Sequence, residues 1–232
     1  MEKKNYFCSA YNYRQQMLDN ISPEQIKEQF KSNNKLRIIT LVVGGIIVIV
    51  LGYFAYRQFL WQPENEKSKD SYWIGLNHVA VDSTDLAIEE LESQVKKYDG
   101  KVGGEVAQFV LARQYMSKGE FEAALKELEG VDVDDEYVAV MSIGLQADCY
   151  SELKGDKNYG KAYDLYLKAA EKSDNEFTAP MYLMKAGLVA EELKNFDKAT
   201  ECYQKIKDDY ASYASQKAID KYIARAKNKT TK

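Results

Sequence analysis

Three stretches decide the fold of this chain: FEAALKELE at residues 121–129, YGKAYDLYLKAA at 159–170 and FDKATECYQKI at 196–206. Each begins with an aromatic residue, has an alanine three residues later, and has a large apolar or aromatic residue four positions further on. This spacing is typical of one face of an α-helix. A weaker copy, DLAIEELE, lies at residues 85–92. The aligned alanines are 37, 38 and 37 residues apart, and a fixed period of this size predicts a repeated helical hairpin. They are Ala87, Ala124, Ala162 and Ala199.

A second helical segment precedes each of the three stretches: LARQYMSKGEF at 111–121, QADCYSELKGDKNY at 146–159 and KAGLVAEELKNF at 185–196. The middle segment has about three extra residues, which we expect in the turn around residues 154–158. One hairpin cannot cover its own apolar stripe, so successive hairpins must stack. Besides the four alanines, the residues expected to pack between helices are Ala112, Ala147, Gly187, Tyr115, Tyr150, Phe121, Tyr159 and Phe196.

The pattern of Ala112, Tyr115, Gly119, Phe121 and Ala124 resembles the tetratricopeptide repeat family. The resemblance implies an all-α fold, a right-handed α-solenoid of helical hairpins. We expect a degenerate repeat at residues 68–100, repeats at 105–138, 143–174 and 180–213, and a capping helix at 214–228. The chain departs from the family pattern because the large residue early in each first helix is mostly missing, and no proline closes each unit.

An apolar run without charge, IITLVVGGIIVIVLGYFAY, occupies residues 38–56 between Arg37 and Arg57. As a helix it would be about 29 Å long, close to the ~30 Å hydrocarbon core of a bilayer. A signal peptide would have a shorter apolar region nearer the start and small residues at its end. We therefore expect a single transmembrane helix at 37–61 that stays as an anchor, with Tyr53, Tyr56 and Trp61 at the membrane surface.

Charge predicts the orientation of this helix, because basic residues favour the cytoplasmic side. Seven Lys and Arg residues precede the run, and four of them lie close to it. We expect a cytoplasmic tail at 1–36 and an extracytoplasmic domain at 62–232. The family resemblance given below implies a bacterial inner membrane, and a eukaryotic organelle membrane is the alternative. Ser22, Pro23 and Gln25 predict the start of a short helix in the tail, running to about residue 35.

Composition and motifs speak against several classes of function. The net charge of −4 and the pI near 5.3 disfavour nucleic acid as a partner. Cys8, Cys149 and Cys202 form no metal-binding motif, and Cys149 and Cys202 are either paired in an oxidising compartment or buried as free thiols. His78 is the only histidine, and no catalytic or phosphate-binding motif is visible. We expect no enzyme, and hence no catalytic residue, metal, cofactor or small-molecule substrate.

In the tetratricopeptide family, the first helix of each repeat lines a concave surface. The resemblance places four of the six methionines there, and methionine side chains can adapt to different apolar partners. We expect a protein-binding groove for extended or partly unfolded chains, the alternative being that the methionines pack between repeats. The expected groove residues are Phe109, Arg113, Met116, Met141, Asp148, Met181, Met184, Leu188 and Glu191.

The whole layout, from about residue 25 onward, is similar to the bacterial ancillary translocon subunit family. That resemblance implies a membrane-anchored, non-catalytic interaction module whose partners are the SecYEG translocon, a membrane-anchored periplasmic chaperone and exported polypeptides. The alternative function is a structural scaffold for another envelope complex, in cell division or secretion.

Overall fold

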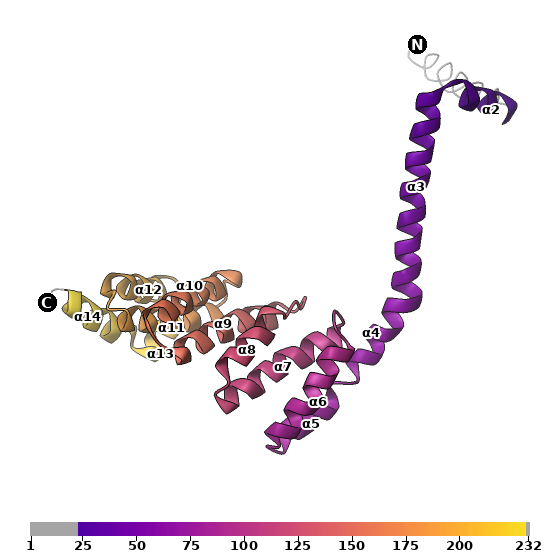
Figure 1. Ribbon diagram of the computed structural model, residues 1–232. Helices are drawn as coiled ribbons and strands as arrows, with labels where there is room; N and C mark the ends of the chain where they lie inside the picture. Colours follow the sequence, from indigo (N-terminus) through magenta and orange to yellow (C-terminus); the bar gives the residue numbers. More distant parts are fainter. Residues whose placement is uncertain (1–22, 231–232) are drawn as a thin grey trace, which may run out of the picture. The chain divides into compact units, whose positions relative to one another are not determined.

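The computed structural model describes residues 23–230. It divides into two units, residues 1–62 and 63–232, which are described separately below. Every regular element within residues 23–230 is a helix, and no strand occurs there. The expected all-α solenoid of stacked helical repeats is thus confirmed (Figure 1).

The first unit contains α2 (Pro23–Ser32), α3 (Asn34–Tyr56) and the π-helix η1 (Arg57–Trp61). The Asn33 side chain caps α3 by accepting hydrogen bonds from the backbone N–H groups of Lys35 (3.1 Å) and Leu36 (3.3 Å), so the apolar helix begins at Asn34. No residue of α3 is buried by the rest of the protein, and this is the one described helix long and apolar enough to cross a membrane. Ser22, which we expect to cap α2, and Cys8 lie outside the described residues.

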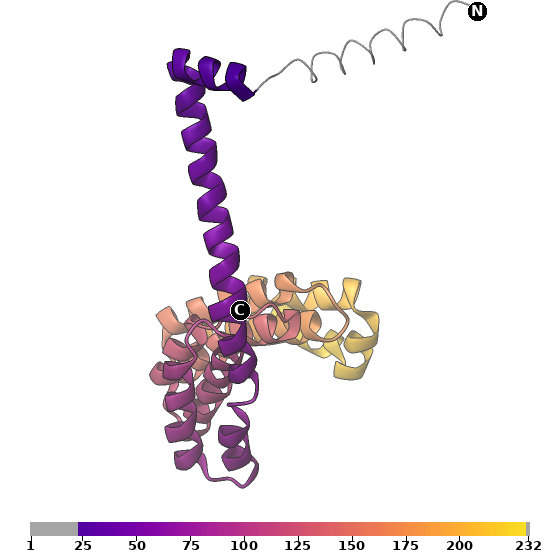
Figure 2. The same ribbon diagram turned by 90° about the vertical axis from the view of Figure 1, so that its right-hand side faces the viewer.

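From α5 to α12, the second unit is a row of antiparallel helices, each packed against the next along the chain (Figures 1 and 2). Its elements are α4 (Gln62–Lys69), which begins at the unit boundary, α5 (Trp73–Ala80), α6 (Thr84–Lys97), α7 (Val102–Lys118), α8 (Phe121–Glu129), α9 (Glu136–Leu153), α10 (Asp156–Lys172), α11 (Thr178–Glu192), α12 (Phe196–Asp209), α13 (Ala211–Lys217) and α14 (Ile219–Thr230). The hairpins are α5–α6, α7–α8, α9–α10 and α11–α12.

Alanines lie where these helices cross. The alanines at positions 87, 124, 162 and 199 of the second helices are fully buried, as are those at 112 and 147 of the first helices. Small side chains allow the helix axes to approach closely, and larger residues then fill the space on either side. The buried side chains form three clusters, one between α6 and α7, one across α7, α8 and α9, and the largest from α9 to α14.

The helix α4 is part of the repeat domain because its polar side chains cap a helix far along the chain. The backbone N–H of Val102 donates to Asn65 Oδ1 (2.9 Å), and that of Gly103 donates to Ser68 Oγ (3.0 Å). These bonds satisfy N–H groups at the start of α7 that have no partner within the helix. Gly103 is required at this contact, since a Cβ there would lie 1.9 Å from the Ser68 carbonyl oxygen.

The three extra residues of the middle repeat extend a helix instead of lengthening a turn. Only Lys154 and Gly155 separate α9 from α10, and both have positive φ values (54° and 88°). The helix α10 then begins at Asp156, three residues before Tyr159, whereas α8 and α12 begin at the equivalent aromatic residues. Similarly, α9 begins at Glu136, because Asp135 caps it, and not near residue 143.

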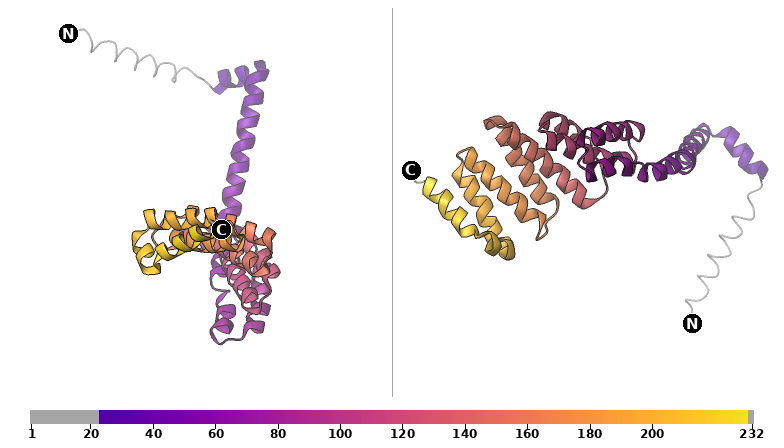
Figure 3. Two further views of the ribbon diagram at one scale, coloured as in Figure 1. Left: turned by 90° about the vertical axis from the view of Figure 1, so that its left-hand side faces the viewer. Right: turned by 90° about the horizontal axis from the view of Figure 1, so that it is seen from below.

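The C-terminal segment, expected as one capping helix, is two helices. Ala218 adopts a left-handed conformation (φ 52°, ψ 50°) that ends α13 and changes the chain direction. This break allows α14 to lie along α12 and to bury Ile219, Ile223 and Ala226 against the domain (Figure 3). Burying each large apolar side chain contributes roughly 1.5 to 3 kcal/mol. Together these contributions outweigh the free-energy cost of the left-handed backbone conformation at Ala218.

Candidate protein-binding face

The first helices of successive hairpins, α7, α9 and α11, form the face on which the sequence places the binding residues. A direct ion pair joins two of these helices: Lys185 Nζ on α11 lies 2.7 and 2.9 Å from the carboxylate oxygens of Asp148 on α9. Because 37 residues separate this pair in the sequence, it reports contact between neighbouring repeats. We use the name first-helix face for the surface formed by α7, α9 and α11.

Asp148 is the centre of a polar cluster. Besides Lys185, it accepts a hydrogen bond from the Tyr166 hydroxyl (2.5 Å), and the rings of Tyr166 and Tyr182 stack with their centroids 6.3 Å apart. Lys185 Nζ lies 5.6 and 5.8 Å from these two ring centroids, within the range of cation–π attraction. Burial, with a contribution from Asp148, raises the pKa of Tyr182 to about 12 and raises that of Tyr166 further. Both phenols therefore stay protonated at neutral pH.

The ring of Tyr182 fits against Gly144, which has no side chain. A Cβ at Gly144 would lie 2.1 to 2.3 Å from ring and hydroxyl atoms of Tyr182. The glycine thus allows an aromatic residue of α11 to pack directly on the backbone of α9. The sequence pattern indicates Asp148 as a groove residue but gives no signal for Lys185, Tyr166 and Tyr182, because their role depends on contacts between repeats.

Glu191, expected at the rim of the groove, is an internal anchor for the C-terminal helix. Its side chain is 7% exposed and accepts hydrogen bonds from Arg225 Nη2 (2.5 Å), the Tyr203 hydroxyl (2.9 Å) and Lys229 Nζ (3.4 Å). Burial opposes ionisation of Glu191, but the hydrogen bonds and charges of these partners outweigh it, so the pKa of Glu191 lies below its ordinary value.

The four methionines do not lie in equal environments. Met184 is buried in the large cluster, while Met116 and Met181 are partly buried and pack against the adjoining clusters. Met141 is exposed on α9. Of the remaining expected groove residues, Phe109 is buried, Arg113 is exposed, and Leu188 is 39% exposed. The most exposed side chains of this set are therefore those of Arg113, Met141 and Leu188.

The residues expected to pack between helices lie at the helix contacts. Gly187 permits a close approach, since a Cβ there would lie 2.4 Å from the Tyr203 ring. The aromatic residues among them are partly buried and pack against the clusters: Tyr115, Tyr150, Phe121 and Tyr159. Phe196, at the start of α12, is partly buried beneath Lys229, whose Nζ lies 5.4 Å from the ring centroid.

The two described cysteines are free and buried on α9 and α12. Burial raises the pKa of the Cys149 thiol to about 12 and that of Cys202 to about 11, so both stay protonated at neutral pH. Within residues 23–230, no group of three or more His, Cys, Asp or Glu side chains is placed to hold a metal ion. His78 lies on α5, near the end of the first hairpin's first helix.

Stacked helical hairpins define a helical-repeat protein, and this repeat fold indicates a protein–protein interaction module. The model of the tetratricopeptide repeat-like domain family matches residues 27–221, so the chain belongs to this family. The crystal structure of MamA is similar, with a TM-score of 0.50 and 20% sequence identity, and the match covers 68% of this chain and 95% of MamA. At this identity the likeness concerns the fold alone. No curated protein sequence matches the chain significantly.

Proposed function

We propose that this protein is a membrane-anchored interaction module that binds polypeptides at the outer face of a bacterial inner membrane. On this proposal α3 spans the membrane with the N-terminus in the cytoplasm, and the repeat domain acts in the periplasm as an ancillary subunit of the SecYEG translocon and its chaperone network. The observation that carries the proposal is the first-helix face, which offers Arg113, Met141 and Leu188 on three successive repeats, in a chain that also has an apolar anchor.

Charge supports the orientation. The domain that follows the apolar helix contains 24 basic and 32 acidic residues, whereas basic residues predominate before it. An acidic domain is repelled by anionic lipid headgroups, and a basic flank favours the cytoplasmic side. Partners of the domain are then proteins that pass through or reside in the periplasm.

Cysteine labelling tests the orientation directly. In a Cys8→Ser background, where the two remaining native thiols are buried, we expect Lys221→Cys to react with a membrane-impermeant maleimide in cells with a permeabilised outer membrane. The matched variant Lys27→Cys, exposed on α2, should react only after the inner membrane is disrupted. The reverse pattern would place the repeat domain in the cytoplasm and contradict the proposal.

Site-specific photo-crosslinking tests the partner. A photoreactive amino acid at Leu188 or Arg113 should crosslink to translocon subunits and to newly exported chains of varied size. The same group at Lys168, exposed on the second helix α10, is the control and should give few products. If both positions instead crosslink to one folded protein, the result would support the alternative function, a structural scaffold for another envelope complex.

A further inference from the structure

Two segments forty residues apart present the same short pattern at the N-terminal ends of successive first helices. They are DDEY at residues 134–137, which leads into α9, and DNEF at 174–177, which leads into α11. Each ends in an exposed aromatic residue: Tyr137 is 62% and Phe177 is 72% exposed. Exposed aromatic side chains at equivalent positions of adjacent repeats contribute nothing to the buried clusters, so packing within the chain does not account for them.

Local hydrogen bonds hold both aromatic residues in place. Asp135 Oδ1 accepts from the backbone N–H of Val138 (2.9 Å) and so fixes the first turn of α9 around Tyr137. Asn175 Oδ1 accepts from the N–H groups of Phe177 (2.9 Å) and Thr178 (2.7 Å). An aromatic residue on an ordered backbone loses little conformational freedom when it binds a partner.

The two segments lie next to each other. The Ser173 hydroxyl, directly before the second segment, donates to Glu136 Oε1 in the first (2.5 Å). Beside Phe177, a cavity of about 400 Å³ opens between the start of α11 and α13. Its lining residues are Glu176, Phe177, Met181, Ser212, Tyr213, Gln216 and Lys217. We use the name aromatic edge for the surface formed by Tyr137, Met141, Phe177 and Met181 with this cavity.

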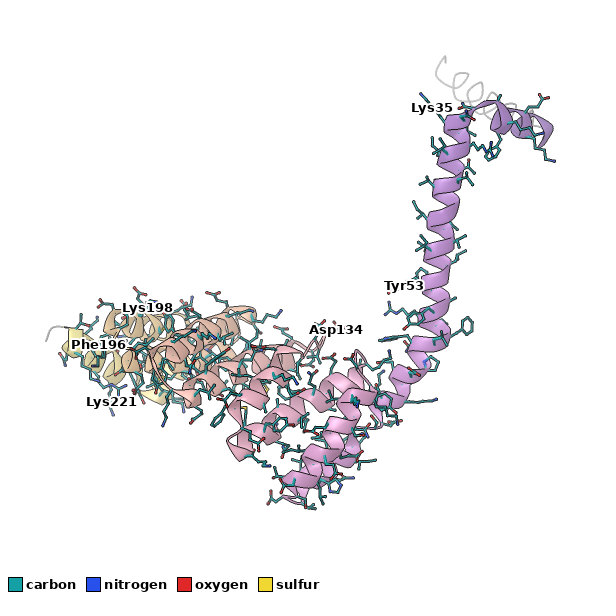
Figure 4. The ribbon with its side chains drawn as sticks, viewed as in Figure 1. Lys35, Tyr53, Asp134, Phe196, Lys198 and Lys221 are labelled. Carbon is teal, nitrogen blue, oxygen red and sulfur yellow. The ribbon has the colours of Figure 1, made fainter. Side chains whose placement is uncertain are left out.

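The rim of the aromatic edge is acidic. Residues 130–137 contain four acidic and no basic residues, and residues 173–177 contain two acidic and no basic ones. None of these acidic side chains forms a salt bridge with a Lys or Arg in the described part of the chain. Asp134 lies at the tip of the loop between α8 and α9 (Figure 4). Lys172 precedes the second segment, and Lys217 lines the cavity with its Nζ 5.9 Å from the Tyr213 ring centroid.

We propose that the aromatic edge docks a basic amphipathic polypeptide segment, whose apolar side chains cover Tyr137 and Phe177 and whose Lys or Arg side chains pair with the acidic rim. Aromatic residues dominate the energetics of protein interfaces, and complementary charge supplies specificity and a faster association. The inference rests on the proposed protein-binding function and names the chemistry of one partner.

The test uses the full chain in phosphatidylcholine nanodiscs and a fluorescent helical peptide made of leucine and lysine. We expect fluorescence anisotropy to show binding, and Tyr137→Ser/Phe177→Ser to weaken it about tenfold or more. Asp134→Asn/Glu176→Gln should weaken it about threefold at low salt, and this difference should disappear at ~1 M salt because surface charges are then screened. The same peptide with glutamate in place of lysine should not bind.

Matched controls alter exposed residues elsewhere. Leu86→Ser on α6 and Glu89→Gln/Glu122→Gln should leave the affinity unchanged, and circular dichroism should show the same thermal midpoint for every variant. Three results would overturn the proposal. The first is equal binding of the lysine and glutamate peptides, and the second is no binding once the signal of empty nanodiscs is subtracted. The third is self-association of the chain that the aromatic variants abolish. Crosslinks from Leu188 that persist in the aromatic variants would show that the wider protein-binding function stands independently.

Discussion

Replacing Gly144 by alanine should lower the free energy of unfolding of the repeat domain by about 3 kcal/mol. The new methyl group would lie 2.1 Å from Cε1 of the Tyr182 ring, far inside van der Waals contact. Tyr182 is buried in the large cluster and stacked on Tyr166, so the ring cannot move aside without disturbing the contact between α9 and α11. Overpacking of this kind usually costs about 1 to 3 kcal/mol, and we expect a value at the upper end of this range because the clash is so close.

Gly160 provides the matched control. It also lies within a helix, α10, but a Cβ there would meet nothing within 4 Å. Gly160→Ala should therefore stabilise the protein by about 0.5 to 1 kcal/mol through helix propensity alone. Thermal unfolding followed by circular dichroism separates the two variants, because a 3 kcal/mol loss lowers the midpoint by roughly 6 to 12 °C in a domain of this size. Equal midpoints for the two variants would show that Tyr182 does not pack on Gly144.

Replacing Glu191 by glutamine should weaken the attachment of the C-terminal helix α14, because Glu191 on α11 holds Arg225 and Lys229 of α14. The glutamine has the same shape but leaves the positive charges of Arg225 and Lys229 without a carboxylate partner. Breaking a buried ion pair costs about 3 to 5 kcal/mol, and we expect about 2 to 3 here because Arg225 can still reach water. Hydrogen exchange of the amides of α14 measures the loss. Glu192→Gln, at the exposed neighbouring position, should leave that exchange unchanged.

The same contact makes the stability of α14 depend on pH. The pKa of Glu191 is lowered in the folded protein, so its contribution is complete above the pKa of an unfolded glutamate, about 4.3. Stability is then lost as the pH falls through the folded pKa of Glu191. In Glu191→Gln this part of the acid dependence should be absent, and a wild-type acid profile in that variant would assign the effect to another carboxylate.

The sequence predicted the solenoid because its signal is local and recurs. The alanine period, the aromatic residue three positions before three of the four alanines, and the small residues of the first helices are all local signals, and the family match and the helical structure confirm the fold they indicate. The uninterrupted apolar run predicted a candidate membrane helix for the same reason, since length and hydropathy are properties of one segment. The repeat boundaries, the binding residues and the orientation remain predictions.

Contacts between residues far apart in the sequence could be identified only from the tertiary structure. Asn65 caps a helix that begins 37 residues later, Asp148 pairs with Lys185 at the same separation, and Glu191 meets Arg225 across 34 residues. No periodicity marks such partners, because each depends on how one repeat is rotated against the next. That rotation also decided which side chains of the first helices remain available, since it buries Met184 and Glu191 and leaves Leu188 exposed. Hydrophobic periodicity thus encodes which helices form and stack, whereas packing between repeats selects the residues that a partner can reach.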